Sequence, residues 1–209
     1  MTALGVVEED GLDALTMRRV ASALDVTPMS LYNHVADKAE LVDLMVDFLI
    51  GEVMVQSADD RGDWEARLRA LVLRNHSMLR SHPGLVRVYA EGVTPGPNGL
   101  AAMDLAVGLL REAGFDDAEA GAAFMVLFQW SMGTLLVGGQ ARTSDPSMSS
   151  QEHIRALFSA LPLEDMPNVV ATMPCLSDHS NDFGLDVIMA GLRARLAAKK
   201  SASRRDSAS

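Results

Sequence analysis

The side chains with the clearest chemistry lie together in residues 27–35, which read Thr-Pro-Met-Ser-Leu-Tyr-Asn-His-Val. Thr27 followed by Pro28 is typical of a helix start, because threonine caps the first turn and proline fits its first position. The spacing of Leu31 and Val35 turns both apolar side chains to one side of that helix. Short polar and small apolar groups on the other side can touch base edges and thymine methyl groups in a DNA major groove. The predicted base-reading residues are Pro28, Met29, Ser30, Asn33 and His34.

A second short helix is predicted just before this segment, capped by Thr16 and running to about Leu24. Two helices of about two turns with a tight connection at residues 24–26 have the pattern of a helix-turn-helix. The predicted shared core is Val20, Ala21, Leu24, Val26, Leu31 and Val35. Groups suited to DNA phosphates complete the predicted DNA-contacting set, which adds Thr16, Arg18, Thr27, Tyr32 and Lys38. Tyr32 has an alternative interpretation as an aromatic residue of the core.

Two further patterns describe the elements that must position this segment. Asp37 with Glu40 forms a capping box that predicts a helix over residues 38–55. Its apolar residues are expected to form one continuous face, made of Leu41, Leu44, Met45, Phe48, Leu49 and Val53. The polar residues 57–63 mark the best domain boundary. We therefore expect a helix-turn-helix DNA-binding domain over residues 1–55.

The rest of the chain also has helical spacing of its apolar residues, so the predicted fold class is all-α. A second domain, over residues 56–199, is expected to bind an effector and dimerise, followed by a disordered tail at 200–209. Turn-rich loops are expected at 93–99 and 142–150, and a proline-punctuated stretch at 162–174. The predicted helices of this domain cover residues 64–81, 85–89 (started by Pro83), 100–113, 116–138, 151–160 and 181–199.

Composition excludes several classes of protein. The 209 residues contain one cysteine, Cys175, which excludes an internal disulfide and a cysteine-cluster metal site. There is neither an 18-residue apolar run nor a signal-peptide pattern, so we expect a cytoplasmic protein without a membrane partner. The net charge of −10 (18 basic, 28 acidic residues) argues by itself against a nucleic-acid partner. Residues 16–38, however, hold three basic and two acidic residues, so the acidic excess lies elsewhere.

The order of these motifs resembles the TetR family of transcriptional regulators. The resemblance is carried by residues 15–21 (Leu-Thr-Met-Arg-Arg-Val-Ala), 26–35 and 38–41, and most specifically by Leu-Tyr-Asn-His-Val followed by Lys38. It implies an all-α homodimer whose N-terminal domain binds a double-stranded DNA operator and whose C-terminal domain binds a small effector and dimerises. The family usually has basic residues before the position of Gly11, whereas here that segment holds Glu8, Glu9 and Asp10 and no lysine or arginine. We therefore expect a short first helix, together with either a true start upstream of the given one or few phosphate contacts.

The C-terminal half resembles the tetracycline-repressor branch, and its candidate effector site is mainly apolar. Asn75 is in register with Leu68, Leu71 and Leu79, so it points inward, either as a core amide with a partner or as a ligand anchor. The other candidate ligand-binding residues are His76, Met78, Tyr89, Met103, Phe124, Phe128 and Gln129. That branch has a histidine, used with magnesium, near the position of Tyr89. Tyrosine there disfavours a tetracycline–magnesium ligand, so we expect a largely apolar organic effector with no metal and no cofactor.

The last predicted helix carries small residues, including Gly184, Ala190 and Ala194, among larger apolar ones. Together with the helix at 116–138 it is expected to form a four-helix dimer interface; the alternative is a core helix within a monomer. We expect a repressor that its ligand releases from DNA. The sequence shows no nucleophile–base–acid set, which disfavours an α-helical enzyme. A relative that has lost DNA binding and acts through protein contacts is a third possibility.

Overall fold

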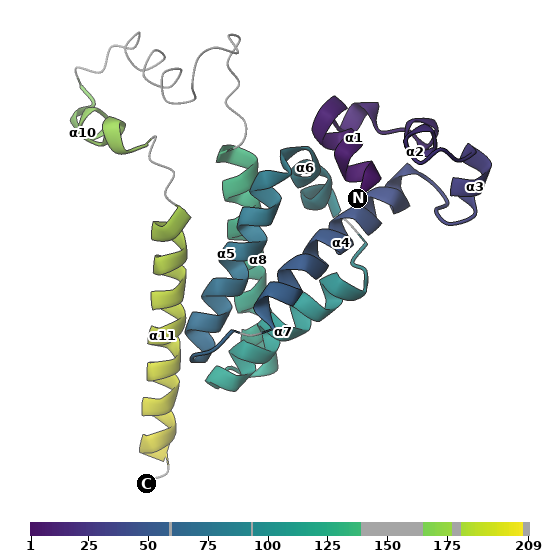
Figure 1. Cartoon of the computed structure of the whole chain (residues 1–209). Coiled ribbons are helices and arrows are strands. Elements are labelled where there is room, and N and C mark those ends of the chain that lie inside the picture. The colour runs from purple at the N-terminus through teal and green to yellow at the C-terminus, as the bar shows by residue number, and fades with distance from the viewer. Residues whose placement is uncertain (59, 93, 139–164, 177–180, 207–209) are drawn as a thin grey trace.

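The computed structural model describes residues 1–58, 60–92, 94–138, 165–176 and 181–206, and these residues form helices with no strand among them. The predicted all-α class is confirmed. Helices α1–α3 lie at one end, α4 runs from them along α7 into the body, and α11 stands beside that body (Figure 1). The elements are α1 (Thr2–Asp10), η1 (Leu12–Ala14), α2 (Met17–Ala23), α3 (Pro28–Tyr32), α4 (Lys38–Ser57), α5 (Trp64–Ser81), α6 (Pro83–Gly92), α7 (Pro97–Ala113), α8 (Asp117–Gly138), α10 (Pro167–Leu176) and α11 (Asn181–Asp206).

The predicted helix starts in the N-terminal region are confirmed. The Thr16 hydroxyl accepts a hydrogen bond from the Arg19 amide at 3.1 Å, and Asp37 accepts one from the Glu40 amide at 2.9 Å. The predicted helix-turn-helix core is only partly right, because Leu24 and Val26 are each 44% exposed. They flank Asp25, whose positive φ of 55° turns the backbone at the surface and directs their side chains outward.

Helix α4 belongs to both halves of the molecule. Most of its buried residues pack with α1–α3 in one core, while Val53 joins the core formed with α5, α7, α8 and α11. The prediction of one continuous buried face was wrong at Leu44 and Phe48, which are 49% and 42% exposed. Their positions are apolar at helical spacing, but the neighbouring helices contact α4 on its other sides.

The C-terminal helices differ from the predicted ones mainly at their ends. Helix α7 begins at Pro97, earlier than residue 100, and α10 lies in the stretch predicted to be interrupted by prolines. Helix α11 continues to Asp206, so residues 200–206 are helical and the predicted disorder there was wrong. The helix predicted over 151–160 lies outside the described residues. No helix among those described is both long and apolar enough to cross a membrane.

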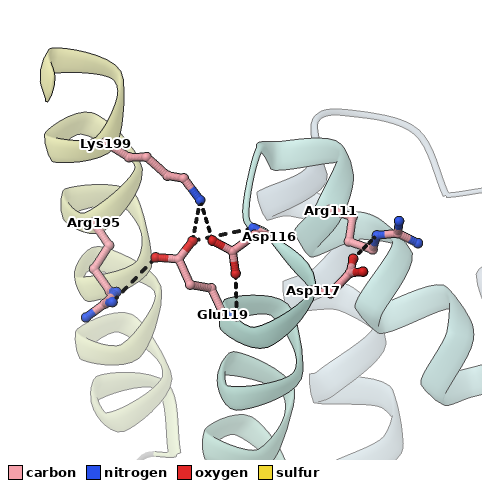
Figure 2. A network of polar contacts seen from close by, with 6 residues as sticks. All are labelled: Arg111, Asp116, Asp117, Glu119, Arg195 and Lys199. Atoms are coloured by element: carbon pink, nitrogen blue, oxygen red, sulfur yellow. Dashed lines mark hydrogen bonds and ion pairs between the residues drawn. The ribbon is translucent and has the colours of Figure 1, made fainter. Parts of the chain in front are cut away.

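A network of charged side chains fastens α11 to the start of α8 (Figure 2). The Lys199 ammonium donates to Asp116 Oδ2 at 2.9 Å and to Glu119 Oε2, and Arg195 lies 3.5 Å from Glu119. Asp116 and Glu119 also cap α8 reciprocally, as predicted. The hydrogen bond from Lys199, with a smaller contribution from the Glu119 amide, lowers the pKa of the Asp116 carboxyl to about 2.

This network gives α11 an acid-dependent attachment. A carboxyl whose pKa falls from 3.8 to about 2 on folding stabilises the fold above pH 3.8 and loses that effect as the pH drops to about 2. Asp116→Asn keeps a capping oxygen and removes the charge, so it should lower the melting temperature at pH 7 but hardly at all near pH 2. Thermal melts from pH 7 down to the acid limit test this. Asp104→Asn, an exposed position, is the control; a pH-independent effect of Asp116→Asn would contradict the assignment.

Candidate functional site

One end of the molecule presents the residues predicted to contact DNA. Leu31 of α3 and Val35, which follows that helix, are buried, while Met29 and Tyr32 of α3 are 73% and 49% exposed. The other predicted base-reading residues, Pro28, Ser30, Asn33 and His34, are also exposed. The exposure of Tyr32 removes the alternative of a core aromatic and leaves its phenol available to an outside partner. The geometry thus offers a short helix held by its inner face, with its polar face open.

The positive charges at this end differ in their availability. Arg18 is exposed and forms no hydrogen bond or ion pair with the described residues. Arg19 instead donates to Asp10 Oδ2 through two nitrogens at 3.1 and 3.2 Å. Lys38 donates to the carbonyl of Leu12 at 2.9 Å, which uses one of its three N–H groups and holds the ammonium beside η1. Arg18 and Lys38 are therefore the cations that could meet phosphates.

A cavity of about 80 Å³ lies among α4, α5, α7 and α8, and Tyr89 of α6 also lines it. It adjoins a groove of about 300 Å³, with which it shares six lining residues. Five of the predicted ligand-binding residues come together in the cavity: Asn75, Tyr89, Met103, Phe124 and Phe128. The rings of Phe124 and Phe128 stack at 6.3 Å, and Tyr89 meets Phe128 edge-on at 5.8 Å.

Three predicted ligand-binding residues lie elsewhere. His76 points away from the cavity, shares a hydrogen bond with Thr134 at 3.0 Å and stacks on Trp130. Burial lowers the pKa of His76, so the ring is neutral at pH 7. Met78 packs where the hydrophobic clusters meet, and Gln129 is exposed. His76 and Gln129 directly follow Asn75 and Phe128, which do face the cavity, and one helical step of about 100° is enough to turn them away.

Sequence reasoning also missed lining residues. Ile50 and Val53 of α4 line the cavity; the sequence places Val53 only on the apolar face of that helix, and Ile50 was not predicted at all. Ser131 lines it as well; its place three residues after Phe128, on the same helix face, was the signal that could have identified it. Burial raises the pKa of Tyr89, which therefore stays a neutral phenol at pH 7.

Polar atoms in the cavity have no partner within the described chain. Asn75 Oδ1 and Ser131 Oγ are both buried without a hydrogen bond. Buried polar atoms are paired in the great majority of proteins, so two unpaired ones in a single cavity call for an explanation. The interpretation of Asn75 as a core amide with a partner is not supported.

The groove beside the cavity contains a contact between α4 and α7 that the sequence did not reveal. Asp47, only 8% exposed, accepts hydrogen bonds from the Gly99 amide at 2.8 Å and from Asn98 Nδ2 at 3.0 Å. A Cβ on Gly96 would lie 2.4 Å from the Asp47 carboxyl carbon, so only glycine fits there. This contact, the Asp47 clasp, fixes the start of α7 against the middle of α4.

The N-terminal and C-terminal regions of the chain each match a family model. Residues 2–45 match "Bacterial regulatory proteins, tetR family", and residues 56–196 match "Tetracyclin repressor-like, C-terminal domain". The protein belongs to the TetR family. The predicted resemblance is thereby confirmed, and this TetR family member is a transcriptional regulator with an N-terminal helix-turn-helix and a C-terminal ligand-binding domain.

Solved structures similar to this regulator cover almost all of it. A possible TetR family transcriptional regulator from Streptomyces coelicolor A3(2) is 34% identical, with a TM-score of 0.77 over 92% of this chain and 96% of the other. Apo ActR from Streptomyces coelicolor is 30% identical, with a TM-score of 0.79 over 95% and 94%. The repressor DrrR1 of Streptomyces coeruleorubidus is 33% identical over 63% of this chain and 48% of its own length.

The Asp47 clasp makes a prediction about stability. Asp47→Ala leaves the Gly99 amide and the Asn98 side chain without their acceptor in a buried place, so the free energy of unfolding should fall by about 2–3 kcal/mol. Asp43→Ala, one turn earlier on α4 and without a hydrogen bond or ion pair among the described residues, is the matched control and should change it by less than about 0.5 kcal/mol. Urea titration of the purified variants measures both. Equal effects would show that the clasp contributes nothing specific.

Proposed function

We propose that this regulator is a homodimeric repressor that holds its operator with α3 and leaves it when a small, largely apolar organic compound fills the cavity. The observation that carries the proposal is that α4 serves both sites. Its first residue, Lys38, contacts η1 beside the helix-turn-helix, and its later residues Ile50 and Val53 line the cavity. A compound that changes the position of α4 therefore changes the position of α3.

The size of the cavity indicates that a bound effector changes the conformation around it. The inner space of about 80 Å³ is small for an organic effector, because ligand sites commonly measure about 300–1,000 Å³. A bound compound must extend into the neighbouring groove, between α4 and the start of α7. The ligand then favours a conformation in which this space is wider, and the equilibrium shifts by the difference in its affinity for the two conformations.

Relatives support both parts of the proposal, repression and the binding of an organic compound. DrrR1 is described as a repressor, and ActR has been solved in complex with actinorhodin, with a TM-score of 0.78 and 31% identity to this chain. The cavity here is lined by aromatic, methionine and aliphatic side chains, which suit an apolar organic molecule. We expect neither a metal nor a cofactor to take part. Among the described residues, both the cavity and the groove are lined by Tyr89 and by no histidine, which continues to disfavour a tetracycline–magnesium ligand.

Dimerisation is assigned to the outer face of α11, in keeping with a family that acts as dimers. Leu185, Met189 and Leu192 face the body and are buried, whereas Phe183 and Val187 are 73% and 55% exposed. The exposed small residues Ala190, Gly191 and Ala194 continue that outer face at helical spacing. Met125 and Val126 of α8, 45% and 49% exposed, supply a second apolar surface. Two copies pairing through α8 and α11 would cover these residues.

A charge placed on the outer face of α11 tests this interface. Val187→Glu should convert the dimer to a monomer at micromolar concentration, because it would bury unpaired carboxylates at the interface. Sedimentation velocity measures the change, and circular dichroism checks that the helices persist. Lys200→Glu, also exposed on α11 but on another side, should remain dimeric. A dimeric Val187→Glu variant would contradict the assigned face.

Operator binding should depend only weakly on salt, since Arg18 and Lys38 are the available cations at the reading end. Two such charges per protomer give a slope of log affinity against log salt of about −4 per dimer, and Arg18→Ala should bring it to about −2. Fluorescence anisotropy on the DNA upstream of the regulator's own gene measures these slopes, with Arg111→Ala of α7 as the control. No sequence-specific binding even at low salt would overturn the repressor assignment in favour of action through protein contacts.

A further inference from the structure

Helix α5 carries Asn75 and His76 next to each other, and α8 carries Ser131 and Thr134 one turn apart; the hydrogen bonding of these four side chains differs in one respect. His76 and Thr134 satisfy each other at 3.0 Å outside the cavity. Asn75 and Ser131, which line the cavity, leave Oδ1 and Oγ buried and unpaired within the described chain. The same two helices can therefore pair polar groups, yet they leave this pair unmatched where a ligand would lie.

The Ser131 hydroxyl shows the same contrast within helices. A hydroxyl on a helix commonly donates to the carbonyl four residues earlier. Buried Ser57 does so to Val53 at 2.9 Å, and Thr134 does so to Trp130 at 3.0 Å. Ser131 is only 6% exposed and forms no such bond. The Ser131 hydroxyl can therefore form a hydrogen bond with a ligand that enters the cavity.

The remaining walls restrict the shape and charge of that partner. Phe124 and Phe128 lie at an interplanar angle of 21°, and Tyr89 stands at 70° to Phe128, which leaves flat aromatic surfaces on the cavity. Neither lysine nor arginine nor histidine occurs among the described residues lining the cavity or the groove. Asp43 and Asp47 line the groove instead. An anionic ligand would therefore meet no opposite charge and two carboxylates.

We propose that the effector is an uncharged aromatic compound carrying a hydroxyl group, and that Asn75 and Ser131 together select that hydroxyl. One hydroxyl can donate to Asn75 Oδ1 and accept from the Ser131 O–H, which pairs both buried atoms at once. An ether or ketone oxygen only accepts and leaves Asn75 Oδ1 unpaired. This assignment rests on the proposed function of the cavity as the effector site.

A matched series of small probes tests the assignment on the full chain: naphthalene, 2-methoxynaphthalene, 2-naphthol and 2-naphthoate. The ring is constant while the polar group changes from none, to an acceptor, to a donor and acceptor, to an anion. Calorimetric or NMR titration should show 2-naphthol binding about tenfold more tightly than 2-methoxynaphthalene, the equivalent of one net hydrogen bond. 2-Naphthoate should bind most weakly. Equal or tighter binding of 2-methoxynaphthalene or 2-naphthoate would overturn the proposal.

Two variants assign the preference to the named atoms. Asn75→Leu and Ser131→Ala should each reduce the preference for 2-naphthol to threefold or less, whereas Ser77→Ala, an exposed serine of α5, should keep it. Removing an unpaired buried polar atom should also raise the melting temperature of the ligand-free protein by about 2–4 °C. A preference that survives in both variants, or a lower melting temperature for Ser131→Ala, would contradict the assignment.

These titrations contain no DNA, so their result does not depend on whether the protein is a repressor. Selective binding of 2-naphthol without any operator binding by the protein would support the site and count against the proposed repressor. Operator binding with no selectivity among the probes would support the repressor and overturn the hydroxyl assignment.

Discussion

The Asp47 clasp is the contact on which the arrangement of the two sites depends. Polar contacts tie α4 to its neighbours at three points: Lys38 ties its first turn to η1, Asp47 ties its middle to Asn98 and Gly99 at the start of α7, and Ser57 at its end accepts a hydrogen bond from Arg74 of α5. Between Lys38 and Asp47 the buried side chains of α4 are apolar, and apolar packing is strong but not directional. The clasp supplies direction, so the position of the cavity wall and that of the reading helix are set by one rigid element.

The cavity shows a balance between stability and recognition. Its apolar lining is well suited to a core, and Val53, Leu68 and Leu71 belong to the main C-terminal cluster. The unpaired atoms of Asn75 and Ser131 cost stability in the empty protein. A protein selected only for stability would gain from apolar residues there. The cost is understandable where binding a partner is the function, because the ligand then recovers the lost hydrogen bonds.

The structure shows where the acidic residues behind the net charge of −10 lie and what they contact. Acidic residues not only lie outside the reading surface but also neutralise part of it, since Asp10 holds Arg19. Other acidic residues hold helices in place: Asp47 binds the start of α7, while Asp116 and Glu119 bind α11 through Lys199 (Figure 2). The acidic total therefore does not exclude DNA. It limits non-specific attraction and leaves recognition to a few defined contacts.

The sequence by itself determined the features that depend on neighbours within four residues. The caps at Thr16, Thr27 and Asp37 are local hydrogen bonds, and the outward face of α3 follows from helical periodicity. The aromatic part of the cavity was also predictable, because Phe124 and Phe128 share one face of one helix.

Only the tertiary structure decided what depends on distant segments. It exposed Leu24, Val26, Leu44 and Phe48, turned His76 toward Thr134 and left Ser131 unpaired. Asp47 and Asn98 are 51 residues apart, and no local pattern encodes which helices will meet or which polar atoms their packing will leave without a partner.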